Sequence, residues 1–331
     1  MCKSVHIVRS VLVFLLFVLA GCRNPNELEL PVHRIACMSS SYIAYLEAIG
    51  ADSLVCAVSG ISYVSNSAVL ERYKKTVSGT LDGELPMYDI GYDTVLDYDK
   101  VLEANPDVVV AYTIGGSKPD YLKKLESLGL NVYVMNDYLA ESPLERASAV
   151  LEFGRLTGRE ELAQHYYDSL ASRYNALAAS VVRDNHVKVL INIPYADAWY
   201  IPGADSYMSR LIRDAGGEIL GTEAGTKSGI ISMEDAYALS MEADVWLNPG
   251  MVSTRGELAS LHQIFPRFAP LSRGLPIYNN TLRMTGKGGN DFWESGAAHP
   301  DKILEDLIKI FSSVRDGEED NNDYNYHFRL D

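Results

Sequence analysis

The sequence predicts an α/β protein of two similar lobes joined by one long α-helix, with a ligand cleft between the lobes. The chain has 331 residues, which is more than one hydrophobic core usually takes. Short apolar runs alternate with segments of helical spacing, a pattern typical of parallel sheets covered by helices. Two segments also share one sequence pattern, LEANPDVVVAY at 102–112 and SMEADVWLNPG at 240–250. This shared pattern indicates that each lobe contains a helix, a strand and a loop in the same order.

The first lobe, predicted over 33–141, begins with a strand, a helix and a second strand. HRIACM at 33–38 and SLVCAVS at 53–59 are apolar runs of strand length, and the helix between them ends at Gly50. This order favours parallel pairing through a right-handed crossover. After a stretch rich in Gly, Ser and Tyr at 60–92, the predicted elements are helix 98–104, strand 107–112, helix 118–128 and strand 130–135.

A linking helix is predicted over 142–183. Apolar residues recur there at helical spacing, and Gly154 and Gly158 are the only strong breakers. We expect one continuous helix that can bend at GRLTGRE, 154–160.

The second lobe, predicted over 184–314, repeats the order of the first. Its predicted strands are 187–193, 198–203, 244–248 and 274–280, and its predicted helices are 204–217, 232–241, 256–265 and 299–314. Ligands of such lobes bind beyond the carboxyl ends of the strands, so two facing lobes would share one cleft. The tail, 315–331, is acidic and polar, and we expect disorder there, with YNYHFRL at 324–330 as an alternative edge strand.

The N-terminus predicts a bacterial lipoprotein. Lys3 and Arg9 precede an apolar run at 11–20 that is too short to span a bilayer comfortably. The run ends in LAGC, so residues 1–21 are a predicted signal peptide, Cys22 is the predicted lipidated residue, carrying diacylglycerol and palmitate, and 22–32 is a polar tether. A plain signal peptide and an uncleaved anchor are the alternatives.

Charge and cysteine content narrow the possible partners. The net charge is −15, which excludes nucleic acid as a plausible partner because phosphate binding needs a basic face.

Cys37 and Cys56 lie within apolar strands. They could pair in an oxidising compartment, but two buried small residues are the simpler interpretation.

Aromatic and arginine residues near strand ends are the candidate ligand contacts. Flat, semi-polar rings suit a large planar or catecholate ligand, with ordinary core packing as the alternative. The candidates are Tyr42, Tyr63, Tyr88, Tyr112, Tyr138, Trp199, Tyr200 and Trp293. Arg255 and Arg283 each follow a predicted strand and could bind carboxylate, phosphate or an anionic iron complex, or could be solvated surface residues.

Catalytic and metal-binding patterns are absent from the sequence. The histidines fall at strand starts or within helices, so no protein-bound transition metal is predicted. GTEAGTKSG at 221–229 lacks phosphate-loop spacing, and there is no G-x-S-x-G elbow. We therefore predict no catalytic residues and no enzymatic activity.

Several motifs together resemble the class III periplasmic binding proteins of ABC importers, which carry vitamin B12, ferric siderophores and haem. The resemblance covers roughly 32–312 and rests on the lipobox, the linking helix and four segments. These segments are RIACMSSSYIAYLEAIGA, DYDKVLEANPDVVVAY, WYIPGADSYMSRLIRDAGGEIL and SMEDAYALSMEADVWL. The resemblance implies two Rossmann-like lobes with a rigid bridge. It also implies that Asp99, where the family usually has Glu, and Glu234 meet arginines of the permease. The helix dipole and capping alone would also explain both acids.

The resulting expectation is a periplasmic lipoprotein, anchored to the membrane through Cys22. It would capture a ferric siderophore or cobalamin and deliver this metal chelate to an ABC permease and its ATPase, with no cofactor of its own. Haem is an alternative ligand, with a tyrosine as axial ligand. A lipoprotein enzyme of the chelatase type would need convergent His or Cys residues. A sensor or scaffold lipoprotein would leave the two acids without a partner.

Overall fold

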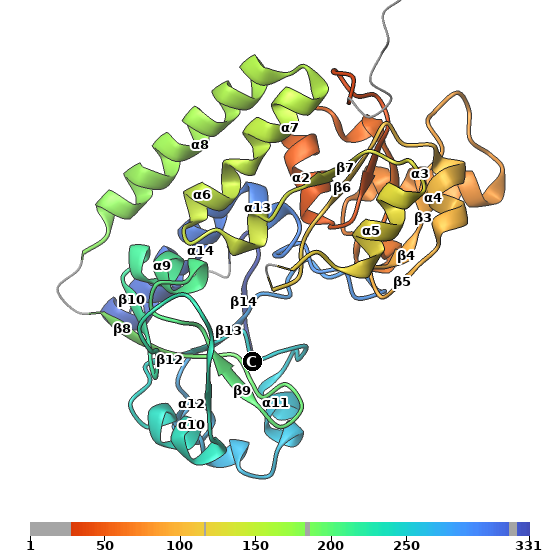
Figure 1. The fold of residues 1–331 in the computed structure, drawn as a ribbon. Helices are drawn as coiled ribbons and strands as arrows, with labels where there is room; N and C mark the ends of the chain where they lie inside the picture. Colours follow the sequence, from red (N-terminus) through yellow and green to blue (C-terminus); the bar gives the residue numbers. More distant parts are fainter. Residues whose placement is uncertain (1–27, 116, 183–185, 318–322) are drawn as a thin grey trace, which may run out of the picture.

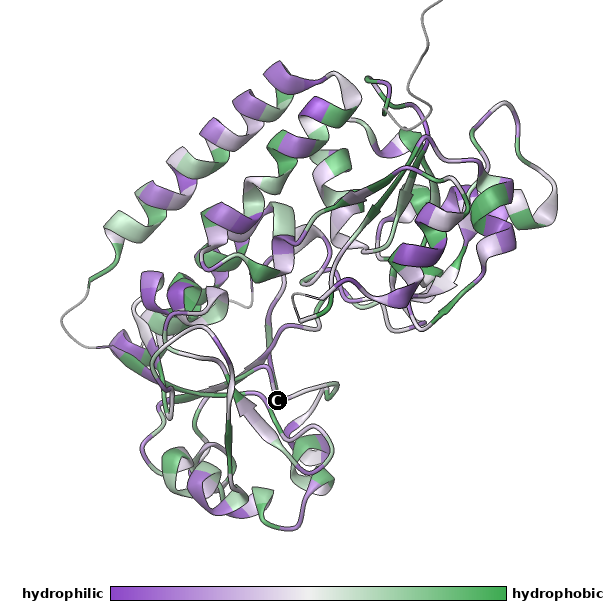
Figure 2. Ribbon diagram, in the orientation of Figure 1, coloured by the Kyte–Doolittle hydropathy of each residue, from purple (hydrophilic) through white to green (hydrophobic). Residues whose placement is uncertain are grey.

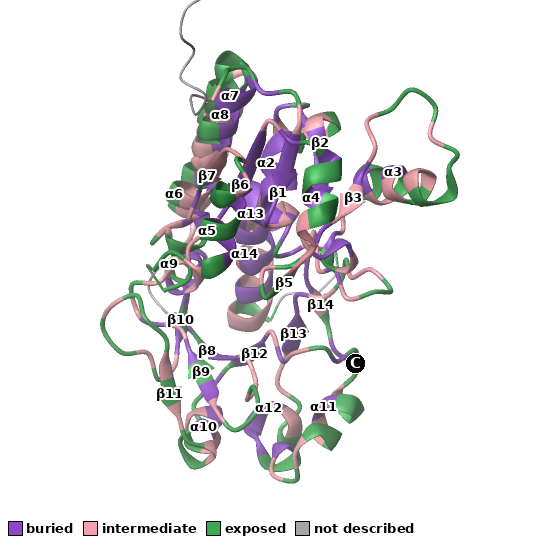
Figure 3. Cartoon of the chain, turned by 45° about the vertical axis from the view of Figure 1, so that its right-hand side comes forward, coloured by how far each residue is buried: buried purple, intermediate pink, exposed green. Residues whose placement is uncertain are grey.

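The computed structural model describes residues 28–115, 117–182, 186–317 and 323–331, and it shows two α/β lobes (Figure 1). The predicted signal peptide and Cys22 lie outside these residues. Hydrophobic residues concentrate on the strands of both lobes and on parts of the helices that cover them (Figure 2). The most buried segments are the central strands of the two sheets, together with parts of α2, α13 and α14 (Figure 3). The predicted fold class is confirmed.

The N-terminal lobe is built on a parallel sheet of strand order β3-β2-β1-β6-β7. Its strands are β1 (Ile35–Cys37), β2 (Val55–Val58), β3 (Tyr88–Asp89), β6 (Val108–Ala111) and β7 (Val132–Val134), and a hairpin joins β4 (Gly91–Tyr92) to β5 (Val95–Leu96). The helices are α2 (Ser41–Ala48), α3 (Ser67–Ser78), α4 (Tyr98–Ala104) and α5 (Asp120–Ser127), with 3-10 turns η1 (Asp52–Leu54), η2 (Ile61–Tyr63) and η3 (Asp137–Leu139). Because the sheet is covered on both faces, β1, β2 and β6 are buried throughout, as their uninterrupted apolar runs predict. The helix α3 was not predicted.

The C-terminal lobe has strand order β10-β8-β12-β13-β14. The parallel strands are β8 (Val187–Ile191), β10 (Gly217–Ile219), β12 (Val245–Leu247) and β13 (Ile277–Asn279), and β9 (Trp199–Ile201) pairs with β11 (Gly229–Ile231) in a separate antiparallel ribbon. The helices are α9 (Tyr207–Asp214), α10 (Met233–Ser240), α11 (Arg255–Leu261), α12 (Ala269–Ser272), α13 (Ser295–Ala298) and α14 (Pro300–Asp316), with the turn η4 (Phe265–Arg267).

The prediction of one continuous linking helix over 142–183 is wrong. The segment forms α6 (Pro143–Ala147), α7 (Ala149–Thr157) and α8 (Glu160–Ser180). Gly158, with φ of 68°, ends α7 in the left-handed conformation, and the chain turns back so that α8 packs beside α7 (Figure 1). A side-chain carbon at Gly154 would lie 2.5 Å from Cβ of Ala163, so this close packing requires glycine. The helix α8 alone leads the chain from one lobe to the other.

The chain crosses between the lobes a second time after β13. The short helix α13 packs against α2, and Ala297 and Ala298 belong to the core of the N-terminal lobe. The helix α14 then returns to pack on α8 and β8. The helix α13, which was predicted to belong to the second lobe, is therefore part of the core of the first lobe.

The prediction of a disordered tail is wrong for 323–331, and 318–322 lie outside the described residues. Strand β14 (Phe328–Arg329) pairs antiparallel with β13, which confirms the alternative of an edge strand. Tyr326 and His327 are buried, and their backbone N–H groups donate to the buried Asp306 carboxylate at 2.8 and 3.2 Å. This carboxylate supplies the acceptors that a short strand alone would lack.

Candidate ligand-binding cleft

The parallel sheet of the N-terminal lobe has its topological switch point between β1 and β6. The chain runs from β1 outwards through β2 and β3, and then resumes on the other side with β6 and β7. The loops that follow two adjacent strands run in opposite directions at such a point, so a crevice opens between the two loops. Ser39 follows β1 and Tyr112 follows β6, so both residues lie at this crevice.

A cavity of about 440 Å³ occupies the switch point, and we name it the N-lobe cavity. It is lined by Met38, Ser39, Ser41, Tyr42, Asp93, Tyr112, Thr113, Ile114, Gly115, Asp137, Tyr138 and Arg146. Its walls thus come from the segments after β1, β6 and β7, from the β4–β5 hairpin and from α6.

Three of the predicted tyrosines meet in the N-lobe cavity. The ring centroids of Tyr112 and Tyr138 lie 6.2 Å apart, edge to face. The Tyr112 hydroxyl donates to Asp93 at 3.1 Å, and the Tyr138 hydroxyl donates to the Thr113 carbonyl at 2.7 Å. Tyr42 is fully buried and donates to the Met135 carbonyl at 2.6 Å. Burial raises the pKa of Tyr42 and Tyr112, so both phenols are neutral at physiological pH.

An ion pair closes the cavity where the two lobes meet. The Nε of Arg146 donates to Oδ2 of Asp137 at 3.1 Å, and the Tyr45 hydroxyl donates to the same oxygen at 3.0 Å. The Arg146 guanidinium also lies over the ring of Tyr207, 5.4 Å from its centroid. Since Tyr207 belongs to α9, this arginine connects the N-lobe cavity to the C-terminal lobe.

Exposed aromatic and apolar side chains follow the strands of both lobes. Tyr195 after β8, Met251 after β12 and Trp293 after β13 are 81%, 73% and 49% exposed. In the other lobe, Tyr63 is 57% exposed and packs edge to face on Tyr92, with ring centroids 5.7 Å apart. Large apolar side chains that gather at exposed loops indicate a binding surface.

A buried carboxylate joins the lobes beside the cleft. Glu294, which follows β13, accepts the backbone N–H groups of Ser65 and Asn66 at 2.8 and 2.7 Å, and Ser65 Oγ donates to Asp291 at 2.9 Å. Glu294 is 2% exposed, and this burial raises its pKa to about 7. We name these four residues the Glu294 contact.

Trp199 and Arg255 do not lie where the sequence places them. Trp199 is 2% exposed, stacks on Trp246 in the core and donates from Nε1 to the Ile191 carbonyl, because alternate residues of β9 face opposite sides. Its neighbour Tyr200 points outward and is 43% exposed. Arg255 donates to the Leu275 carbonyl, at the amino end of β13, so it lies away from the strand's carboxyl end.

Tyr88, Arg283 and Trp293 occupy other positions. Tyr88 lies on the edge strand β3, which packs against α4, and it does not line the N-lobe cavity. Burial, and then Glu103 of α4, raise its pKa. Arg283 pairs with Asp291 at 3.2 Å and borders a second cavity, of about 670 Å³, at the junction of the lobes. Trp293 packs on Phe292 with half of its side chain exposed.

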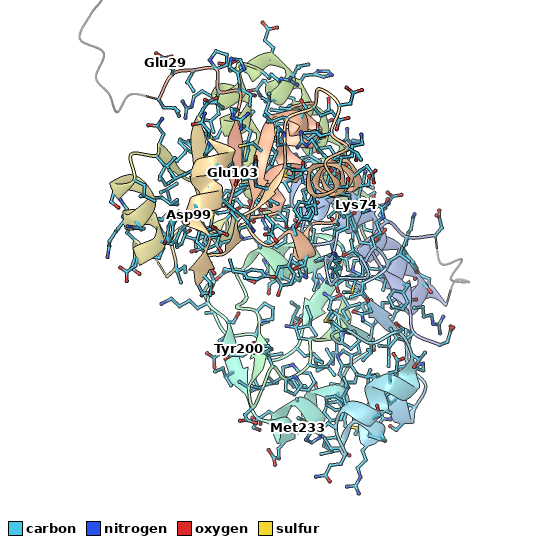
Figure 4. All side chains as sticks on the ribbon, turned by 90° about the vertical axis from the view of Figure 1, so that its right-hand side faces the viewer. Glu29, Lys74, Asp99, Glu103, Tyr200 and Met233 are labelled. Atoms are coloured by element: carbon cyan, nitrogen blue, oxygen red, sulfur yellow. The ribbon has the colours of Figure 1, made fainter. Side chains whose placement is uncertain are left out.

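The acids Asp99 and Glu234 are exposed, and other residues cap their helices. Asp97 accepts the N–H of Lys100 at the start of α4, and Ser232 with Asp235 forms a capping box at the start of α10. Side-chain capping therefore does not account for Asp99 or Glu234, but both lie in the first turn of a helix, where the helix dipole favours a carboxylate. Asp99 lies on one lobe, and Met233, the neighbour of Glu234, lies on the other (Figure 4).

Asp137, Arg146, Tyr195 and Met251 were not predicted as site residues. Asp137 lies three residues after the end of β7 and directly before Tyr138, so the strand-end rule could have found it. Nothing local identifies Arg146, because its position depends on Asp137 and on the other lobe.

Within the described parts of the chain, no three His, Cys, Asp or Glu side chains gather in a way that could hold a metal ion. Cys37 and Cys56 are buried free thiols. Among the described helices, none combines the length and the apolar character that crossing a membrane requires.

The architecture defines a class of protein, a two-lobed binding protein with a cleft at the ends of its strands. The sequence profile of the family described as Periplasmic binding protein matches residues 35–261. The chain therefore belongs to the periplasmic binding protein family. Among proteins with curated descriptions, none matches this sequence.

Solved structures of this fold include binding proteins for different ligands. The periplasmic haem-binding protein HutB of Vibrio cholerae is 19% identical, with a TM-score of 0.61, over 82% of this chain and 97% of that chain. The vitamin B12-binding protein BtuF of Vibrio cholerae is 14% identical, with a TM-score of 0.55, over 86% and 98%. The triscatecholate siderophore-binding protein FeuA of Bacillus subtilis is 14% identical, with a TM-score of 0.59, over 87% and 95%. At these identities the comparison shows a shared fold.

Proposed function

We propose that this protein is the substrate-binding component of an ABC importer for a metal chelate of the siderophore, cobalamin or haem type. The observation that carries the proposal is the cluster of Tyr42, Tyr112 and Tyr138 at the switch point of one lobe, together with exposed aromatic residues on the loops of the other. Rings of this kind bind flat or aromatic surfaces, and the chain needs no reactive group to do so.

Haem is a second specific candidate, because Tyr63 meets the needs of an axial ligand. Its side chain is 57% exposed on the loop after β2, and Tyr92 supports one face of its ring. Haem iron is held by tyrosine in some proteins. A siderophore would instead use the same ring for stacking.

Delivery and anchoring complete the proposal. Asp99 and Glu234 are exposed, one on each lobe, and their carboxylates would pair with arginines of the permease, which works with its ATPase. Cys22 would carry the lipid that holds the protein at the membrane, in the periplasm. Labelling with a radioactive fatty acid tests the anchor, since Cys22→Ser should abolish incorporation while Cys56→Ser should not.

Titration of the purified mature protein tests the ligand. Haemin, cyanocobalamin and a ferric triscatecholate are added separately while tryptophan fluorescence is followed. Trp293 is the exposed tryptophan of the described chain, whereas Trp199 and Trp246 are buried, so Trp293→Phe should remove most of the quenching. Binding of one compound at micromolar concentration or below supports the proposal, and the absence of binding to all three contradicts it.

A further inference from the structure

The C-terminal segment, 323–331, has no role in the proposed function, yet it is tied to the C-terminal lobe along its length. At its start, Lys309 of α14 donates to the Asp323 carbonyl at 3.0 Å. In its second half, β14 pairs with β13, and at its end the Asp331 carbonyl accepts the N–H of Arg255 at 3.2 Å. A segment that is held at both ends forms a fixed support for the side chains that pack on it.

The buried Asp306 carboxylate of α14 fixes the middle of this segment. It accepts the backbone N–H of Asn325 at 2.7 Å, besides those of Tyr326 and His327, and Nδ1 of His327 lies 3.0 Å from its Oδ2. Burial alone would raise the pKa of Asp306, but hydrogen bonds from His327 and the backbone lower it, so the carboxylate is charged. Hydrogen bonds to a charged group are strong, and they hold the backbone that carries Tyr326 and His327 in one position.

The rings of Tyr326 and His327 pack against Phe292. Their centroids lie 6.0 and 5.5 Å from that of Phe292, with interplanar angles of 90° and 84°. Edge-to-face pairs of this kind are favourable. Phe292 in turn packs on Trp293, with centroids 4.7 Å apart and an interplanar angle of 84°. The C-terminal segment therefore contacts Trp293 through one intervening ring.

Tyr326 also contacts the loop of Trp293 on both sides of that residue. The Arg283 guanidinium lies over the Tyr326 ring, 5.3 Å from its centroid. The Tyr326 hydroxyl lies 2.9 Å from Oγ of Ser295, within hydrogen-bond distance. Because Arg283 precedes Trp293 and Ser295 follows it, one buried side chain connects both arms of the loop to the C-terminal segment.

The same loop is also held against the N-terminal lobe. The Glu294 contact attaches the residues next to Trp293, and a side-chain carbon at Gly289 would lie only 2.8 Å from the Tyr63 carbonyl oxygen. Trp293 itself does not line the cavity at the junction of the lobes, and half of its side chain is exposed. Its ring is thus available to a ligand, in a position that its packing on Phe292 determines.

We infer that the C-terminal segment is a positioning element of the ligand site, and that Tyr326 and His327 hold Trp293 at the cleft through Phe292. The inference rests on the proposed function, in which Trp293 contacts the ligand. The Trp293 loop and the C-terminal segment both lie beyond residue 261, so this arrangement is outside the part of the chain that the family profile matches.

Fluorescence of the ligand-free mature protein tests the positioning. Trp199 and Trp246 are buried, so quenching by acrylamide reports mainly on Trp293. Tyr326→Leu removes a ring that holds Phe292. We expect it to shift the emission to longer wavelength and to raise the quenching constant towards that of free indole. Both changes should disappear when Trp293→Phe is added.

Two control variants separate positioning from a general loss of stability. Tyr324→Leu makes the same substitution on the same segment, but Tyr324 packs on Tyr278 of β13, with centroids 5.8 Å apart. It should leave the Trp293 signal unchanged. Tyr326→Phe retains the ring and should retain the wild-type signal. An unchanged signal in Tyr326→Leu, or an equal change in Tyr324→Leu, overturns the inference.

A second variant replaces Tyr326→Leu if that protein does not fold. His327→Asn can keep a donor for Asp306, but it loses the ring that packs on Phe292. The same change in the Trp293 signal is expected, and its absence overturns the inference.

Ligand affinity tests whether the positioned ring serves the site. The chelates of the titration are coloured, so affinity is measured by equilibrium dialysis and absorbance, without use of the tryptophans. Tyr326→Leu should weaken binding by about 2- to 10-fold, the size of one aromatic contact. In a Trp293→Ala background the same substitution should have no further effect, because it acts through Trp293.

The affinity results separate the inference from the proposed function. Equal losses from Tyr326→Leu with and without Trp293, or an unchanged affinity in Trp293→Ala, overturn the inference and leave the proposed function intact. If no chelate binds, the proposed function fails, and the fluorescence of the ligand-free protein still decides whether the C-terminal segment positions Trp293.

Discussion

The Glu294 contact makes stability depend on pH in a direction opposite to that of most acids. The pKa of Glu294 is raised from 4.5 to about 7 in the folded protein, because its carboxylate is buried. The folded state therefore binds the proton more tightly than the unfolded state. Its contribution to stability is fully present below pH 4.5 and is lost as the pH rises through 7. A difference of this size corresponds to about 3 kcal/mol.

The perturbation is Glu294→Gln, which removes the titration and keeps the shape of the side chain. Urea unfolding is measured for both proteins at pH 5 and pH 8, and the difference between wild type and variant is compared at the two pH values. Other titrating groups cancel in this double difference. We expect the wild type to lose about 2.5 kcal/mol relative to the variant on going from pH 5 to pH 8, because the contribution is already incomplete at pH 5. Glu71→Gln, at an exposed side chain, is the control, and it should show no such change.

Parallel pH dependence in wild type and Glu294→Gln would refute the reasoning, because it would mean that Glu294 titrates alike in the folded and unfolded protein. The variant also loses one acceptor for the N–H groups of Ser65 and Asn66. That loss shifts stability equally at both pH values, and so it does not imitate the predicted effect.

Three further predictions follow from the fold and the surface acids. Asp99→Ala combined with Glu234→Ala should leave ligand affinity unchanged and abolish uptake in whole cells, whereas Glu71→Ala should affect neither. Asp306→Asn should lower the free energy of unfolding by about 3 kcal/mol, since hydrogen bonds to a buried charge are lost, and should accelerate amide hydrogen exchange in β14. Gly154→Ala should cost about 1–3 kcal/mol in urea unfolding, because the added carbon overpacks the α7–α8 contact; unchanged stability would contradict this packing.

The strands and most helices could be predicted because their causes are local. Strands buried on both faces read as apolar runs, and α4 was predicted at its observed bounds because Asp97 caps it and Asn105 ends it in the left-handed conformation. The reversal between α7 and α8 was missed because two glycines within a helical pattern were read as tolerated breakers. Gly158 is instead a helix end, and Gly154 permits the close approach of the next helix.

From the sequence, the site could be predicted only for residues that directly follow a strand, because such residues lie at the carboxyl edge of the sheet. Tyr112 and Tyr138 each follow a strand of the same sheet, so the strand-end rule places both. Trp199 and Tyr200 are neighbours with opposite environments, and the choice between them depends on how β9 packs on the core. Arg146 lies in a helix predicted only as a linker, and its contacts with Asp137 and Tyr207 depend on the assembly of both lobes.

These lobe contacts also determine how the cleft can bind a ligand. The lobes are joined by α8, by the insertion of α13 into the core of the N-terminal lobe, by the Glu294 contact and by Arg146 over Tyr207. Large hinge closure would have to break the buried bonds of Glu294 and withdraw Ala297 and Ala298 from an apolar core. Because this is costly, the cleft is largely formed before the ligand arrives. Affinity then comes from positioned rings, with little free energy spent on ordering the protein.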